Sequence, residues 1–484
     1  MNRSSRFRWL PMALVVPAAL LGRQLLMTID SDRLTAVAAG ASLVACFLAC
    51  RRRRGLRLLS PAALYLVVFG LFHLGMALPW AVGFYDEKLP PWFLSNRLTP
   101  ALALVALALA CYLAGLLSAP SAAPLEPRAA PIYVNRLLFA LGLAVYLAGC
   151  GMFLAGIQTF GGARFFDAGY AETYRLTAQF DPRLFGTSFT FVPIGLYLAA
   201  ASFPGRWIAL VVAISLVWVG GILFLGFRGY ALIPGLVVLA VLDRRGYRVP
   251  AWAGGALVAA VLAAIPLTRL MRDQSVRQRS PARSWTQVRL LDGVVEMGGS
   301  LRPLVHTVAY VDGQSRRWGA TYWQSLAAVW PNLSQRWGGG RYIPLDDLPP
   351  NHWLTAQAEP DMYRHHGGLG FSAVAEPYMN FGVAGVAAYF LALGALLVRA
   401  DGPATARPVP LALWAVVLGP LLWTARNSFE IFFRPAVWGA ALVLAAWCAA
   451  PLARSARWRP RLAPVLPPEP SCALEDAHAR AGGL

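Results

Sequence analysis

The sequence predicts an all-α polytopic membrane protein with about twelve transmembrane helices and one large extramembrane loop subdomain. Its composition supports this prediction, because 57% of the 484 residues are hydrophobic and only 14% are charged. A soluble domain has about 25% charged residues. The apolar residues also form long runs, and groups of arginines separate these runs. Both observations argue against a soluble enzyme.

Apolar runs long enough to cross a bilayer, which takes about 20 residues, occur in both halves of the chain. The runs are 9–27, 34–50, 58–79, 99–118, 136–158, 186–203, 207–226, 229–243, 250–268, 371–398, 409–424 and 434–450. The first run leads directly into a second one and lacks a small-residue cleavage site, so we interpret it as a membrane helix rather than a signal peptide. The runs predict a bundle of about nine helices in 1–268 and about three helices in 371–450.

The arginines between the runs predict which side of the membrane each loop faces, because cytoplasmic loops carry an excess of basic residues. Arg51 to Arg54 lie between the second and third runs, and alternate loops further along, at 244–248, 399–407 and 454–461, are also basic. Both termini are therefore predicted to be cytoplasmic. The Pro-rich tail in 451–484 is expected to be disordered.

The same alternation places the segments 80–98, 159–186 and 269–370 on the outer side. The last segment is large enough to fold as a subdomain, and a broken helical periodicity runs through 284–311. We expect amphipathic helices lying on the membrane in 269–370. No repeat relates the two halves of the chain, as it does in many transporters.

The outer segments are rich in arginine, which the membrane orientation does not explain. The net charge is +20, but the charges interrupt apolar runs instead of forming a basic face, so nucleic-acid binding is not expected. Arginine binds phosphate bidentately and keeps its charge, as a site for a lipid-linked diphosphate would require. Contact with lipid headgroups is the alternative for any one of them. The predicted substrate-binding arginines are Arg175, Arg228, Arg272, Arg279 and Arg302.

A second group of polar residues lies where the large outer loop re-enters the membrane. Glu376, Tyr378 and Asn380 precede Gly382 and Gly385. A carboxylate near the lipid boundary needs a partner or a function, and an asparagine offers both donors and acceptors. We predict Tyr378 and Asn380 as substrate-binding residues. A loop-to-helix cap with a packing face is the alternative.

Transfer of a sugar to a hydroxyl needs a base that accepts the hydroxyl proton. His306 follows Arg302 by four residues and therefore shares a helical face with it. We predict His306, His365 and Glu376 as catalytic candidates, and a solvated histidine is the alternative for each imidazole. His352 is a further candidate base.

Other polar residues receive structural interpretations. His73 lies inside an apolar run and is expected to be buried and hydrogen-bonded. Glu430 and Arg434 are four residues apart around the last outer turn, so they can pair on a helix and anchor it.

No metal and no cofactor are expected. The chain has no GxxxxGK[ST] loop and no strand-associated GxGxxG, and its six cysteines form no CxxC pair. An activated sugar would therefore have to arrive attached to a lipid.

Two short stretches carry a family resemblance. Residues 376–385 are similar to the Glu-x-Tyr-x-Asn-Phe-Gly-x-x-Gly pattern of the bacterial oligosaccharide repeat-unit polymerases, the Wzy-type O-antigen polymerases, and residues 227–230 to that family's arginine at the outer end of a central helix. The layout of apolar runs resembles this family and its relatives, the O-antigen ligases. Arg175 and Arg302 also begin Arg-x10-Gly patterns similar to those in the family's third and fifth periplasmic loops.

The resemblance implies a GT-C-like glycosyltransferase of the bacterial inner membrane, in O-antigen, lipopolysaccharide or exopolysaccharide biosynthesis. It would transfer a growing glycan from undecaprenyl diphosphate to a hydroxyl of an incoming lipid-linked unit at the periplasmic face. Arg228, Arg272 and Arg279 would bind the diphosphates, and Arg302 and Arg175 would orient donor or acceptor. A flippase and a chain-length regulator are candidate partners.

Two alternatives stay open. Ligase-type glycan transfer is one of them, and a histidine pair at 365–366 is compatible with it. A flippase or polysaccharide transporter is the other, but a transporter places its charged groups near the bilayer midplane between two related halves. The position of the arginines on one face favours the enzyme.

Overall fold

The computed structural model describes residues 10–52, 58–85, 89–119, 134–159, 162, 185–247, 249–272, 290–313, 315–330, 348–364, 368–401 and 407–454. Every regular element in these ranges is a helix, and no strand occurs among them. The prediction of an all-α fold is confirmed.

Each of the predicted apolar runs is helical, and the run at 58–79 is divided between two helices. The long helices are α2 (Leu10–Ile29), α3 (Asp32–Arg52), α4 (Pro61–Leu74), α6 (Leu98–Ser118), α7 (Arg136–Gln158), α10 (Phe185–Ser202), α11 (Ile208–Phe224), α12 (Arg228–Arg244), α13 (Ala251–Arg272), α22 (Ala375–Arg399), α23 (Pro408–Trp423) and α24 (Glu430–Arg454). The shorter helices are α5 (Ala77–Ala81), α16 (Leu290–Gly298), α17 (Arg302–Val311), α18 (Ala320–Ala327), α20 (Pro350–Ala358) and α21 (Pro360–Arg364).

Many of these helices can cross a membrane. Within the described ranges, seven helices are long and apolar enough to do so, namely α2, α3, α6, α7, α11, α22 and α24. The apolar helices α4, α10, α13 and α23 provide shorter candidates. The chain is therefore a multi-pass membrane protein, and the number of twelve crossings stays a prediction.

The run at 58–79 differs from its prediction as a single span. The structure ends α4 at Leu74 and begins α5 at Ala77. The break lies where α16 packs against the chain, since a Cβ atom on Gly75 would lie 2.5 Å from the Val294 carbonyl oxygen. A side chain at Gly75 would leave no room for α16, so the glycine permits this close approach at the end of α4.

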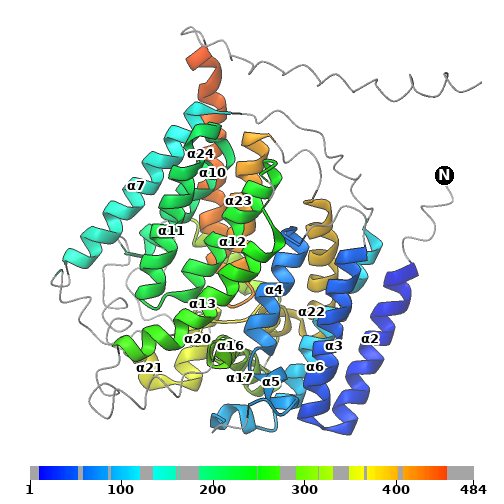
Figure 1. Cartoon of the computed structure of the whole chain (residues 1–484). Coiled ribbons are helices and arrows are strands. Elements are labelled where there is room, and N and C mark those ends of the chain that lie inside the picture. The colour runs from blue at the N-terminus through cyan, green and yellow to red at the C-terminus, as the bar shows by residue number, and fades with distance from the viewer. Residues whose placement is uncertain are drawn as a thin grey trace, which may run out of the picture.

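The two ends of the bundle differ in what they carry (Figure 1). The beginning of α2 is the upper end of that helix, and the end of α24 is the top of the bundle, whereas α5, α16, α17, α20 and α21 gather at the opposite, lower end. We call this lower end the loop end. The described helices of the predicted outer loop 269–370 that are labelled there thus lie together with α5, which leads into the predicted outer loop 80–98.

Helix α22, which starts at the loop end, packs closely against α6. A Cβ atom on Gly115 would overlap the Leu391 carbonyl oxygen, and one on Gly394 would overlap the Tyr112 carbonyl oxygen. Small residues allow helix backbones to approach this closely. The position of α22, which carries Glu376, is therefore set by backbone contact with one of the most buried helices of the bundle.

The helices of the large loop have apolar faces that pack on the bundle. In α17, one face buries Leu304, Val305, Val308 and Val311. This helix contacts α6, α20 and α22. The apolar face of this predicted amphipathic helix thus packs against the helices of the bundle. Contact of the loop helices with a membrane surface stays a prediction.

Candidate active site

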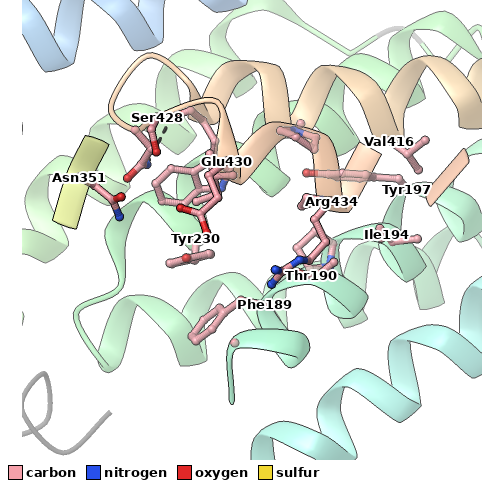
Figure 2. Close-up of a pocket in the computed structure, with 18 of the residues that line it drawn as sticks. Phe189, Thr190, Ile194, Tyr197, Tyr230, Asn351, Val416, Ser428, Glu430 and Arg434 are labelled. Atoms are coloured by element: carbon pink, nitrogen blue, oxygen red, sulfur yellow. Dashed lines mark hydrogen bonds between the residues drawn. The ribbon is translucent and has the colours of Figure 1, made fainter. Parts of the chain in front are cut away.

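A cavity of about 440 Å³ lies at the loop end, between α10, α12, α20, α23 and α24 (Figure 2). Three aromatic residues from three helices form one side of it: Phe189, Tyr230 and Trp423. The ring centroids of Phe189 and Tyr230 are 4.2 Å apart, and those of Tyr230 and Trp423 are 4.5 Å apart. This size is typical of a site for a small organic ligand, and the three neighbouring rings, which are tilted against one another, offer it an apolar surface.

Polar side chains from other segments face the same space. Asn351 and His352 come from the first turn of α20, and Asn427 and Ser428 come from the turn between α23 and α24. Amide and hydroxyl groups both donate and accept hydrogen bonds. The cavity therefore combines an aromatic side with a polar side that could bind several hydroxyl groups.

Glu430 and Arg434 add two charges to the cavity, on one side of α24 (Figure 2). Both side chains are half-buried. The Arg434 Nε atom donates a hydrogen bond to the Ala328 carbonyl oxygen at 2.8 Å. Among the residues that the structure describes, no ion pair joins Glu430 to Arg434. The predicted pairing is therefore wrong: the spacing places both charges on one helix face, but that face borders the cavity.

Glu376 connects the start of α22 to the turn before α24. Its side chain is 1% exposed. One carboxylate oxygen accepts a hydrogen bond from the Thr321 hydroxyl at 2.8 Å, and the other accepts one from the Phe429 backbone N–H at 2.7 Å. The carboxylate is thus held by two partners, and it does not line the cavity.

Asn380 lies one turn further along α22 and is also buried. Its side-chain oxygen accepts a hydrogen bond from the Gly319 backbone N–H at 2.9 Å. Its amide donates to the Thr321 hydroxyl at 2.7 Å and to the Glu376 carbonyl oxygen at 2.9 Å. Asn380 therefore binds α18 to α22, as the structural alternative for this motif proposes, and it does not line the cavity.

Tyr378 also contacts neighbouring side chains through its hydroxyl and its ring. Its hydroxyl donates to the Asp312 carboxylate at 2.6 Å, and the Arg316 guanidinium lies over its ring, 5.0 Å from the centroid. Helix α22 is kinked just beyond this point, at Gly382, which has φ 66° and ψ −152°. A residue with a side chain is strained in that conformation. The motif at 376–385 thus shapes the start of α22.

Arg302 and His306 lie on one face of α17, as the four-residue spacing predicts. The Arg302 Nε atom donates to the His306 Nε2 atom at 3.1 Å, and its guanidinium also forms an ion pair with Glu359. Partial burial, together with the charge of Arg302, lowers the pKa of His306 to about 4. His306 is therefore neutral at pH 7, and neither it nor Arg302 lines the cavity.

Arg228 is the first residue of α12, and its side chain is 9% exposed. A guanidinium nitrogen lies 2.5 Å from a carboxylate oxygen of Glu296, which is 31% exposed. The next residue, Gly229, packs so closely on Trp423 that a Cβ atom there would overlap the indole ring. Arg228 is therefore next in sequence to a residue that packs on the cavity-lining Trp423, and it has a partly exposed carboxylate as a partner.

The comparisons agree with this architecture. The family model described as O-antigen polysaccharide polymerase Wzy matches residues 34–451, which is most of the chain. The chain belongs to this family. Protein CapE of Staphylococcus aureus is 26% identical over 197 residues, which are 40% of this chain and 41% of that relative. The matched part thus spans less than half of the relative, and no solved structure matches the chain.

Several predicted site residues of this Wzy-family chain cannot be placed. Arg175, Arg279 and His365 lie outside the described residues. Arg272 is the last residue of α13, and its side chain is likewise outside the description. Their predicted roles stay predictions. In the ranges that the structure describes, no group of three or more His, Cys, Asp or Glu side chains could hold a metal ion.

Some residues on the cavity wall had no predicted role in substrate binding. The cavity is bordered by Tyr230, Trp423 and Ser428, which the sequence argument did not select. A usable signal was present, since each lies at the outer end of an apolar run. His73 is buried and hydrogen-bonded to the Phe69 carbonyl oxygen and the Ser372 hydroxyl, as predicted.

Proposed function

We propose that this protein is a glycosyltransferase that polymerises lipid-linked oligosaccharide repeat units. It transfers a growing glycan from undecaprenyl diphosphate to a hydroxyl of an incoming lipid-linked unit, at the periplasmic face of the inner membrane. Membership of a family of polysaccharide polymerases supports the reaction class. The observation that carries the proposal is the cavity at the loop end, which combines neighbouring aromatic rings, amides and two charges.

The chemistry of the cavity suits a saccharide. A sugar ring has C–H faces that pack on aromatic rings, and its hydroxyl groups need donors and acceptors around the edge. Phe189, Tyr230 and Trp423 supply the aromatic rings, while Asn351 and Asn427 supply hydrogen-bond donors and acceptors. A membrane protein with this cavity near the ends of its helices could bind the glycan while the lipid stays in the bilayer.

Arg228 is the described arginine best placed for the diphosphate. It is close to the cavity through the contact of Gly229 with Trp423, and it begins α12, where the helix dipole favours negative charge. A diphosphate carries more negative charge than the single Glu296 carboxylate that now faces it, so it could join or replace this partner. Arg272 and Arg279 would add to this site, and Arg175 and Arg302 would orient donor or acceptor.

Deletion of the gene tests the proposal against both alternatives. Without a polymerase, single repeat units should still reach the cell surface, while long-chain glycan disappears. Without a flippase or a ligase, surface glycan should be lost entirely. The measurement is the length distribution of surface glycan on a gel, with and without a plasmid copy of the gene. Loss of the single-repeat form on deletion would contradict the proposal.

A further inference from the structure

We propose that Glu430 is the group that accepts the hydroxyl proton during transfer, and that the cavity holds the acceptor sugar against it. This inference rests on the proposed function. It assigns the base to a residue that the spacing pattern had suggested as a structural anchor, and it replaces the predicted candidates His306 and Glu376 in this role.

Glu376 and His306, the two predicted bases whose side chains the structure describes, are poorly placed for contact with a substrate in the cavity. Glu376 is 1% exposed, and its two oxygens already accept hydrogen bonds from Thr321 and Phe429. His306 binds Arg302 through Nε2, its pKa is lowered to about 4, and it is not part of the cavity wall. A base must lie within hydrogen-bond reach of the proton that it takes. Among the described residues, we therefore look for this group on the cavity wall.

Glu430 meets that geometric requirement. It is a half-buried carboxylate on the cavity wall, and no ion pair neutralises it among the described residues. Its backbone is fixed, because the preceding N–H, that of Phe429, donates to the buried Glu376 carboxylate. A catalytic group gains from such fixed positioning. The motif at 376–385 thereby acts on the reaction indirectly, by holding the base in place.

Arg434 complements Glu430 within the same wall. Its Nε atom is held by the Ala328 carbonyl oxygen, so the guanidinium has a defined direction. Its remaining N–H groups can donate to oxygens of the acceptor sugar. The two charges thus offer an acceptor and several donors one helical turn apart, in the same cavity that the aromatic rings line.

The step balances in atoms and charge. The acceptor oxygen forms a bond to the anomeric carbon of the donor sugar, and the bond from that carbon to the diphosphate oxygen breaks. The lipid diphosphate leaves with the electron pair of the broken bond. The proton of the acceptor hydroxyl passes to a carboxylate oxygen of Glu430, which later releases it to water. No oxidant or reductant is needed.

The test uses the full-length protein in bilayer nanodiscs, with the lipid-linked oligosaccharide extracted from cells that lack this gene as the probe. Retention of this probe and the rate of polymer formation are measured separately. Glu430→Gln keeps the size of the side chain but removes the base. It should retain the probe as the wild type does, and its rate should fall about 100-fold or more.

A small carboxylate can replace a missing one when the cavity admits it. Formate should therefore raise the rate of Glu430→Ala at least about tenfold, and it should have no effect on Glu430→Gln, where the amide fills the space. Asp361→Asn is the matched control, because this exposed carboxylate pairs with its neighbour Arg364 on α21 and does not line the cavity. It should behave like the wild type in both measurements.

Two results would overturn the assignment. The first is a Glu430→Gln rate close to that of the wild type; loss of activity in His352→Gln beside it would assign the base to His352. The second is loss of probe retention together with the rate, without formate rescue of Glu430→Ala, which would make the carboxylate a binding group only. A wild-type protein that forms no polymer would instead contradict the proposed function itself.

Discussion

The Glu376 carboxylate accepts a hydrogen bond from the Phe429 backbone N–H at 2.7 Å, although the two residues are 53 positions apart in the chain. This bond joins the start of α22 to the turn that leads into α24. The same carboxylate receives the Thr321 hydroxyl, so three segments meet at one buried group. The Glu-x-Tyr-x-Asn motif therefore organises the loop end of the bundle, and the charged cavity wall begins immediately after Phe429.

Glu376→Ala should destabilise the protein and also lower its activity. The substitution leaves the Thr321 hydroxyl and the Phe429 N–H without their buried acceptor, at a cost of about 1–3 kcal/mol for each unsatisfied donor. The thermal unfolding midpoint in detergent should fall accordingly, whereas Asp361→Ala on the exposed surface of α21 should leave it unchanged. An unchanged midpoint for Glu376→Ala would show that the two hydrogen bonds do not hold this junction.

The parts of the fold that depend on local sequence could be predicted. The apolar runs gave the positions of the helices, and the spacing of Arg302 and His306 gave a contact within one helix. The partner of Arg228 could not be predicted, because Glu296 is 68 residues away and no periodicity connects the two. The position of Glu430 and Arg434 beside a cavity could not be predicted either. Their spacing allows a pair, but the space in front of them is created by distant segments.

The cavity itself depends on several chain segments that are far apart in sequence. Phe189, Tyr230, Asn351 and Trp423 come from four different helices. Phe189, Tyr230 and Trp423, taken alone, are ordinary residues near the ends of apolar runs, and Asn351 is an ordinary polar residue of the large loop. Only the packing of the helices brings their side chains together, and this packing depends on close approaches such as that of Gly229 to Trp423.

Arg228→Ala should abolish long-chain glycan while the single-repeat product persists, because the lipid diphosphate loses its buried cationic partner. Glu296→Gln is the matched variant, since it removes only the other half of the ion pair. It should retain long-chain glycan if Arg228 serves the substrate. The measurement is the glycan ladder on a gel, at equal protein levels in the membrane. Equal loss in both variants would mean that the ion pair has a structural role alone.

His306 should make the protein less stable in acid. Burial and the adjacent Arg302 lower the pKa of His306 to about 4, compared with 6.5 for an unperturbed histidine. Between these two values the unfolded chain binds a proton that the folded chain does not, so stability is lost as the pH falls from 6.5 towards 4. In His306→Gln this contribution should be absent. Unfolding midpoints at pH 7.5 and pH 5 should therefore differ less in the variant than in the wild type, and an equal difference would contradict the shifted pKa.

Reporter fusions should show that the loop end faces the periplasm. The beginning of α2 and the end of α24 lie at the opposite end from the loop helices (Figure 1). Arginine-rich loops favour the cytoplasm for the end that carries the termini. Fusions after residues 55 and 470 should therefore report a cytoplasmic position, and a fusion after residue 300 a periplasmic one. A cytoplasmic signal at residue 300 would place Glu430 and Arg228 on the side away from the proposed periplasmic reaction, so the proposed site could not perform it.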